Sequence, residues 1–322
     1  MVSSEPAPRD ARELVGRRMT VETPATSANL GAGFDALALA LELVNTTTVE
    51  VIDRPTVELS VEGEGAESLK GKRRNRFVVA LDRGLREAGL DPGPLGYRVA
   101  MSNAIPMFRG LGSSATATVA GLTAADALAG GRLGDATRIR LAAEMEGHPD
   151  NGAAAILGGF VVVVAQTGGR YATVSFPPPP SLRCVLFIPD RPLPTREMRA
   201  ALPAQVPHAD AAFNVGRAAL AVAAFATGRL SLLGAATEDR LHERYRARVF
   251  PELPILVRAA RDAGALGACL SGAGSTVIAF TEGDPAAAEV AAAFQQAATR
   301  AGLAGNARVL MPRGTGATVR DG

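Results

Sequence analysis

Strand-like and helix-like segments are intermixed along this chain without a regular rhythm, and that order limits the folds open to it. Alternating apolar and polar residues predict half-buried strands in MTVETPA, TVELSVEG and YRVAMSNAI. Helical spacing of apolar residues predicts helices in NRFVVALDRGLREAGL and RIRLAAEMEG. Because the chain lacks a clean strand–helix–strand alternation, the sequence predicts an α+β fold in two domains.

A run of four prolines, Pro177–Pro180, divides the chain. Before it, the Ala-rich segment from Ser114 to Leu128 is apolar on nearly all sides and predicts a buried helix, and GGFVVVVAQ predicts a buried strand. After it, the predicted elements are strands in LRCVLFIPD, ACLSG and STVIAF, and helices in AAFNVGRAALAVAAFATG and PELPILVRAARDAGA. We expect a disordered leader at 1–18, an N-terminal domain at 19–167, a C-terminal domain at 168–314 and a tail at 315–322.

The composition is that of a globular protein with a sizeable core, since 47% of the 322 residues are hydrophobic and 20% are charged. The formal net charge is only +2, which argues against binding to nucleic acid or to a membrane surface. Cys184 and Cys269 stand far apart in apolar surroundings, which predicts two reduced, buried thiols. No apolar run approaches the ~18 residues of a membrane span, and the N-terminus lacks the apolar core of a signal peptide. We therefore expect a cytoplasmic protein.

The segment IPMFRGLGSSATATVAG has the features of an anion-binding loop. Gly110 and Gly112 flank a turn in which backbone N–H groups can face an anion, and Ser113-Ser114 open the buried helix, whose dipole favours negative charge. The serine hydroxyls can cap the helix or reach a phosphate-bound Mg²⁺. The chain has no GxxxxGK[ST] motif, so this is not a Walker loop. The alternative is an ordinary capped helix after a glycine turn.

Three further clusters each have a plain structural alternative. TPATSANLGAGFD places small polar residues around a glycine turn, where Asn and Asp commonly bond their own backbone. EGHPDNGAAAILGG follows a helix that ends with Glu144 and Glu146, and acidic residues at a helix C-terminus are unfavourable unless a cation lies nearby. LSGAGSTVIAF is a glycine turn between two apolar strands, which also fits a tight hairpin.

Taken together and in this order, PATSANLGAGFD, IPMFRGLGSSA, EGHPDN and LSGAGST resemble the motifs of the homoserine kinase family within the GHMP kinase superfamily. The second and fourth motifs are common to the superfamily, whereas the first and third are narrower. The resemblance covers roughly residues 20–312. Ala32, Gly152 and Ser275 depart from the usual pattern, but each is a small residue in a loop.

The resemblance implies an architecture and an activity. The N-terminal domain should resemble ribosomal protein S5 domain 2, with an unusual left-handed βαβ crossover, and the C-terminal domain should be ferredoxin-like. The site should lie in the cleft between them. The activity implied is ATP-dependent phosphorylation of L-homoserine to O-phospho-L-homoserine, in threonine biosynthesis, with Mg²⁺ and in a homodimer.

The resemblance also implies residue roles. The residues expected to bind or act on the substrate are Asn29, Asp35, His148, Asp150, Asn151, Thr195, Arg199 and Arg246. Those expected around ATP are Pro106, Met107, Phe108, Arg109, Gly110, Leu111, Gly112, Ser113, Ser114, Ala115 and Thr116, with Gly272 and Gly274 supporting the loop. Ser114 and Glu146 are expected to hold Mg²⁺, with Glu144 as the second choice for the carboxylate. Asn151 stands where related mevalonate-type kinases carry an Asp, so a strong general base is not expected.

Two alternatives remain open at this stage. Another GHMP kinase acting on a small alcohol, such as mevalonate or shikimate, would have no need of Asp35 because those substrates lack an amine. A catalytically inactive GHMP-fold sensor would have no need of the phosphate loop, Glu146 and HPDN together.

Overall fold

A seven-stranded sheet forms the first domain of the computed structural model, which describes residues 8, 10–72 and 74–321. Its main path runs β11-β1-β2-β4-β3, and β5 and β6 form a hairpin attached to β2. All pairings are antiparallel except that of β3 with β4, which α2 connects. The strands are β1 (Arg18–Ala28), β2 (Leu37–Ile52), β3 (Val57–Gly63), β4 (Gly96–Asn103), β5 (Phe160–Ala165), β6 (Tyr171–Phe176) and β11 (Thr318–Asp321).

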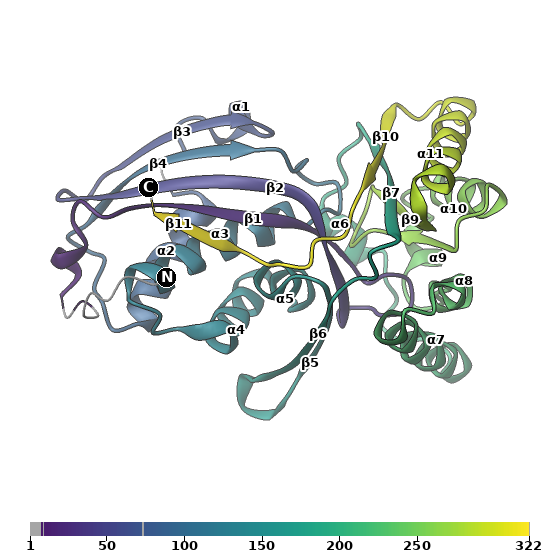
Figure 1. Cartoon of the computed structure of the whole chain (residues 1–322), viewed down its shortest axis with the longest axis horizontal. Coiled ribbons are helices and arrows are strands. Elements are labelled where there is room, and N and C mark those ends of the chain that lie inside the picture. Colours follow the sequence, from purple (N-terminus) through teal and green to yellow (C-terminus); the bar gives the residue numbers. More distant parts are fainter. Residues whose placement is uncertain (1–7, 9, 73, 322) are drawn as a thin grey trace.

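Helices cover one face of this sheet (Figure 1). They are α2 (Arg76–Glu87), α3 (Ser113–Leu128), α4 (Gly134–Glu146) and α5 (Asp150–Leu157), with the short α1 (Ala66–Leu69) after β3. The Asn75 side chain begins α2 by accepting a hydrogen bond from the Val78 N–H. Helix α3 is buried on most of its circumference, as its composition predicts, and it packs against α2 and β1.

The second domain has a four-stranded antiparallel sheet in the order β10-β7-β9-β8. Its strands are β7 (Leu182–Pro189), β8 (Gly267–Leu270), β9 (Val277–Glu282) and β10 (Gly305–Leu310). Its helices are α6 (Thr195–Ala200), α7 (His208–Thr227), α8 (Leu233–Ala236), α9 (Glu243–Arg246), α10 (Leu253–Asp262) and α11 (Gly283–Arg300). Numbered along the chain, the strands lie in the order 4-1-3-2, with helices after the first and third, which is the expected ferredoxin-like arrangement.

The observed domain limits differ from the expected ones. Residues 168–176 belong to the first domain because β6 pairs with β5, so the change of domain falls in the proline run before β7. Residues 315–321 of the expected tail, 315–322, also belong to the first domain, since β11 pairs with β1 from Met19 to Glu22 (Figure 1). The pairing of β11 with β1 joins distant segments and leaves no local mark in the sequence, whereas β6 was missed although it follows β5 in a hairpin.

Part of the expected leader is ordered. Residues 11–14 form a 3₁₀ helix, η1 (Ala11–Leu14), whose first turn is capped by Asp10. Ala11 and Leu14 are buried in the core of the first domain, so the prediction of disorder over 1–18 was wrong for this stretch. Two apolar residues are enough to dock it. The remaining short 3₁₀ segments are η2 (Thr167–Gly169) and η3 (Leu230–Leu232). Residues 1–7 and 9 lie outside the described residues.

Helix α7 is the one described helix that is long and apolar enough, by length and composition alone, to cross a membrane. It is not marked by a continuous apolar run, because Asp210, Asn214 and Arg217 interrupt the apolar residues. One face packs into the core through Ala221, Ala224 and Phe225. Both cysteines are buried and free, as predicted.

Candidate active site

Residues of both domains line a cavity of about 530 Å³. All eight predicted substrate residues line it, as do residues 107–115 of the predicted ATP loop, Gly272 and Glu146. Pro106, Thr116 and Gly274 are not among the lining residues. Thr116 lies just behind the wall, where its hydroxyl donates to the Gly112 carbonyl at 3.0 Å and so supports the first turn of α3.

The glycine-rich loop enters α3 through Gly112, whose φ of +71° is left-handed. A Cβ on Gly112 would lie 2.1 Å from Thr26 Oγ1, and one on Gly110 would lie 2.2 Å from the Ser271 carbonyl oxygen, so both positions require glycine. No side chain caps α3, which leaves the N–H groups of its first turn directed at the cavity. A helix N-terminus of this kind is suited to binding a phosphate group.

The SGAGS turn between β8 and β9 supports this loop from the second domain. Ser271 Oγ donates to the Gly110 carbonyl at 2.7 Å, and the Thr276 N–H donates to the Arg109 carbonyl at 3.0 Å. Arg109 itself donates through Nε to the Pro189 carbonyl at 2.6 Å. The loop is therefore held between the two domains.

Glu146 is the carboxylate at the phosphate end of the cavity. Its side chain is 6% exposed, and Oε1 accepts a hydrogen bond from Thr118 Oγ1 at 2.6 Å. Arg76 lies between the two residues expected to hold Mg²⁺, with Nε 3.4 Å from Glu146 Oε1 and 3.2 Å from Ser114 Oγ. Glu144 lies on the outer surface instead, paired with Arg83 and Arg140.

The donor set fits Mg²⁺ bound mainly through phosphate. The described part of the chain has no group of three or more His, Cys, Asp or Glu side chains that could hold a metal by itself. One buried carboxylate and one hydroxyl are the few protein oxygens that a phosphate-bound Mg²⁺ takes.

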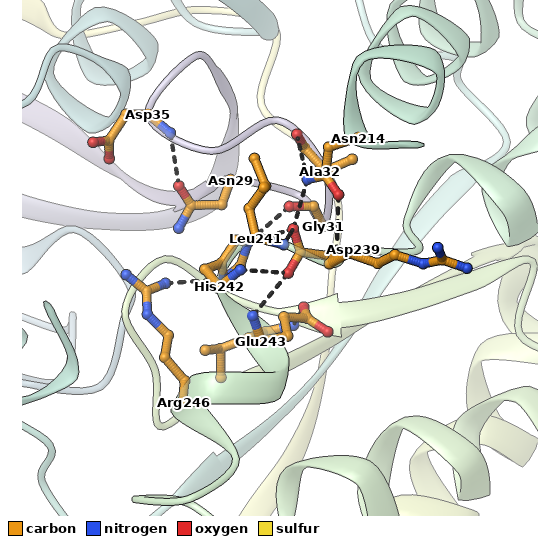
Figure 2. Close-up of polar contacts among 12 residues, drawn as sticks. Asn29, Gly31, Ala32, Asp35, Asn214, Asp239, Leu241, His242, Glu243 and Arg246 are labelled. Carbon is orange, nitrogen blue, oxygen red and sulfur yellow. Dashed lines mark hydrogen bonds and ion pairs between the residues drawn. The ribbon is translucent and has the colours of Figure 1, made fainter. Parts of the chain in front are cut away.

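Asn29 and Asp35 lie on the turn between β1 and β2 (Figure 2), and both line the cavity. Asn29 Oδ1 accepts the Asp35 N–H at 3.0 Å, and Asn29 Nδ2 donates to the Gly272 carbonyl at 2.8 Å. Both residues have positive φ, 69° and 54°, which is uncommon outside glycine and concentrates at functional sites.

Asp35 and Arg199 form a two-pronged ion pair, with N–O distances of 2.7 and 3.1 Å. Both residues were expected to bind the substrate, but their pairing with each other was not foreseen. Thr195 lies one helical turn before Arg199 in α6 and also lines the cavity.

Arg246 lies beside this pair and is almost fully buried, at 1% exposure. Burial, and then the positive charge of Arg199, lower its pKa to about 10, so it stays protonated near neutral pH. Its Nε is buried without a hydrogen-bond partner. An unpaired buried donor of this kind is costly and fits a site for an anionic group.

His148, Asp150 and Asn151 lie at the start of α5. His148 Nδ1 is 2.6 Å from Asp150 Oδ1. Burial alone would lower the pKa of His148, but the hydrogen bond and charge of Asp150 raise it above its usual value. Asn151 Oδ1 accepts the Thr26 hydroxyl at 2.7 Å, and an amide held in this way has no basic atom to offer.

Several residues at or beside this site were not predicted. Arg76 and Thr118 contact Glu146, while Phe34 and His242 contact Arg246. Arg76 and Thr118 carry no local signal. His242 precedes Arg246 by four residues in LHERYR, a spacing that places two side chains on one helical face and could have drawn attention to it.

Comparisons with known proteins agree with this geometry. The family model described as "GHMP kinases N terminal domain" matches residues 75–159, and that described as "GHMP kinases C terminal" matches residues 221–299. The homoserine kinase of Streptomyces coelicolor is 44% identical over 301 residues, which cover 92% of this chain and 95% of the relative. That of Moorella thermoacetica is 42% identical, covering 93% and 99%.

Among solved structures, homoserine kinase from Cytophaga hutchinsonii superposes with a TM-score of 0.84 at 27% identity, covering 94% of this chain and 98% of that one. The similarity to these relatives extends over more than nine tenths of this chain and of each of theirs. This chain belongs to the homoserine kinase family of the GHMP kinases.

Proposed function

We propose that this protein transfers the γ-phosphoryl group of ATP to the side-chain hydroxyl of L-homoserine, giving O-phospho-L-homoserine, a step in threonine biosynthesis. The observation that carries the proposal is one cavity with two chemically different ends: an uncapped helix N-terminus at one end, and Asp35 facing two arginines at the other. The first end suits a triphosphate and the second suits an amino-acid zwitterion. The relatives named homoserine kinase agree with both.

At the phosphate end, the N–H groups of the loop and of the first turn of α3 bind the ATP phosphates. Ser114 and Glu146 are the residues that would hold Mg²⁺, which supplies charge neutralisation to the phosphates when bound. Arg76 lies against Glu146 in the same cavity wall, where its guanidinium would also be available to a phosphate oxygen.

At the other end, the Asp35–Arg199 pair opens to admit the substrate. Asp35 exchanges its arginine for the substrate amine, and Arg199 exchanges its carboxylate for that of the substrate. Arg246 adds a second guanidinium to the same carboxylate. Each charge in the site therefore keeps a partner of opposite sign, which limits the desolvation cost of binding the substrate.

In the transfer step, the homoserine hydroxyl oxygen forms a bond to the γ-phosphorus, and the bond from that phosphorus to the β,γ-bridging oxygen breaks, releasing ADP. The hydroxyl proton passes to a γ-phosphate oxygen. Asn151 does not act as a base. His148 and Asp150 orient the substrate in the cavity. Positioning and charge stabilisation are enough for such a loose transition state.

The test is to incubate the purified protein with ATP, Mg²⁺ and, separately, L-homoserine, mevalonate and shikimate, and to follow the phosphorylated products by ³¹P NMR. The proposal expects transfer to L-homoserine. Transfer to mevalonate or shikimate but not to homoserine would identify a different GHMP kinase. An absence of transfer to any alcohol, with ATP bound, would favour an inactive member of the fold.

The family resemblance also leads us to propose a homodimer in the cytoplasm. Sedimentation equilibrium of the full chain tests the first part, with a mass near twice the 33.1 kDa of one chain as the expected result. A single-chain mass across the concentration range would contradict it.

A further inference from the structure

His242 is a fully buried histidine that does not itself line the cavity. It immediately precedes α9, and its ring joins two elements of different domains (Figure 2). Nε2 lies 2.8 Å from the Gly31 carbonyl oxygen, and Nδ1 lies 3.2 Å from Arg246 Nη1. The first contact reaches the turn that carries Asn29 and Asp35, and the second reaches the buried arginine.

These two partners fix the protonation of the ring. A guanidinium only donates hydrogen bonds, so Nδ1 must accept and carries no proton. The Gly31 carbonyl only accepts, so Nε2 carries the proton. The ring is therefore neutral, and burial, which lowers its pKa to about 4, agrees with this state.

The hydrogen bond from Arg246 to His242 is one of two that fix the guanidinium. Nη1 also donates to the Gly272 carbonyl at 2.9 Å, the same oxygen that accepts Asn29 Nδ2 at 2.8 Å. The face of Phe34 lies 5.5 Å from the Arg246 guanidinium carbon and 5.3 Å from the His242 ring centre. Both hydrogen bonds thus use Nη1, while Nε stays without a partner.

Asp239 in turn fixes the backbone that carries His242. Its Oδ2 accepts the N–H groups of His242 and Glu243, each at 2.8 Å, and its Oδ1 accepts Asn214 Nδ2 at 2.7 Å (Figure 2). Helix α9 has only four residues, too few to hold its own direction. Asp239, which is hydrogen-bonded to Asn214 of α7, holds α9 in its direction and so places the His242 ring.

We infer that His242 is a positioning residue for substrate recognition: it holds Arg246 in register with the Asn29–Asp35 turn, so that the guanidinium meets the carboxylate of an amino-acid substrate. This rests on the proposed function, in which Arg246 binds that carboxylate. A purely structural histidine would stabilise the fold by the same contacts but would leave the choice between substrates unchanged.

Three variants separate the two contacts. His242→Asn keeps an acceptor oxygen near the position of Nδ1 and loses the donor to Gly31. His242→Gln keeps a donor that reaches the Gly31 carbonyl and loses the acceptor for Arg246. His242→Leu loses both. The readout is the ratio of kcat/KM for L-homoserine to kcat/KM for L-homoserinamide, in which a neutral amide replaces the carboxylate.

The inference predicts that His242→Gln and His242→Leu lower this ratio at least about tenfold, the scale of a misplaced charge-assisted contact, with the KM for ATP unchanged. His242→Asn should stay within about threefold of the wild type, because its acceptor is retained. Melting temperatures measured in parallel report stability separately. Should His242→Leu fail to fold, the Gln and Asn variants still carry the comparison.

Arg246→Met provides the decisive control. If His242 acts through Arg246, the double variant His242→Gln/Arg246→Met discriminates no worse than Arg246→Met alone, whereas independent roles give multiplied losses. An unchanged ratio in His242→Gln, or multiplied losses in the double variant, would overturn the inference. A wild type that fails to phosphorylate homoserine would instead overturn the proposed function, so the two failures are distinguishable.

Discussion

At the scale of single residues, the two glutamates near the end of α4 differ sharply in their surroundings. Glu146 is buried at the phosphate end of the cavity, whereas Glu144 is 45% exposed and pairs with arginines on the outer surface. We predict that Glu146→Gln lowers kcat by about 100-fold or more, the usual scale for losing a group that stabilises charge in the transition state. Glu144→Gln is the matched control and should stay within about threefold, because exposed ion pairs contribute little. Steady-state kinetics with Mg·ATP would contradict this if the order were reversed.

A second residue-scale prediction concerns pH and stability. Burial raises the pKa of Glu243 from its ordinary 4.5 to about 8, so the folded state holds a proton that the unfolded state has lost over this range. Stability from this group is therefore present at low pH and is lost as pH rises toward 8, by up to about 1.4 kcal/mol per pH unit. Glu243→Gln removes the titration while keeping an acceptor for the Leu270 N–H.

The measurement is the melting temperature of both proteins between pH 6.5 and 8.5. The melting temperature of the variant should increase relative to that of the wild type as pH rises. His242 has the opposite sign, since its lowered pKa costs stability only as pH falls from 6.5 toward 4, and its contribution cancels in the comparison. A constant difference across the range would mean that Glu243 is ionised in the folded protein.

The individual site residues were expected from the family resemblance, and the eight expected around the substrate all line one cavity. The sequence could not predict which of them touch. Asp35 and Arg199 are 164 residues apart, and their pairing follows only from how the two domains pack. Arg76 lies beside Glu146 because the start of α2 meets the end of α4 within the first domain, and nothing around it in the sequence indicates an ion pair.

At the scale of elements, the loop before α3 depends on Gly112. Ala at this position meets Thr26 Oγ1 at 2.1 Å and also strains a φ of +71°. We predict that Gly112→Ala lowers kcat/KM for ATP by at least about tenfold, since a loop displaced by a fraction of an ångström misplaces its N–H groups.

The control is Gly131→Ala, in the turn after α3, where φ is +81° but nothing lies within 4 Å of the added Cβ. It carries the same backbone strain, a cost of about 1 kcal/mol, without the collision. If both variants lower kcat/KM for ATP equally, the loss reflects backbone strain next to α3 and not the shape of the loop.

Elements with one clear period were predicted well, as in α2, β3 and β4. Strand β2 was missed because it is buried on both faces over its first five residues and alternates only later, so no single period describes it. Helix α9 has four residues, which is less than the length over which periodicity can be recognised. Burial of both faces and short length each remove the signal that the prediction uses.

At the scale of the whole molecule, the first domain begins earlier than the sequence indicated. Leu14 is fully buried in its core, while the adjacent Val15 is 38% exposed. We predict that Leu14→Ala lowers the free energy of unfolding by about 2–5 kcal/mol, as for other buried leucines. Val15→Ala is the matched control and should cost less than about 1 kcal/mol. Chemical denaturation of both variants tests this, and equal small losses would mean that η1 does not belong to the core.

The two-domain division was predictable from the proline run and from the change in element pattern. The pairing of β11 with β1 was not predictable. A strand added to the edge of a sheet from a distant part of the chain has no sequence signal of its own. The sheet of the first domain is therefore completed by β11. The loop before α3 lies between the two domains and is hydrogen-bonded to Ser271 and Pro189 of the second.

The central claim is that the cavity recognises an amino-acid zwitterion through Asp35 on one side and Arg199 with Arg246 on the other. The most direct test is kcat/KM of the wild type for L-homoserine against 4-hydroxybutyrate, which keeps the hydroxyl and the carboxylate but lacks the amine. Leaving a desolvated charge without its partner costs about 2–5 kcal/mol, so homoserine should be preferred by at least about 30-fold. Asp35→Asn should narrow that preference without changing the dissociation constant of ATP. Equal use of the two alcohols by the wild type would contradict the account.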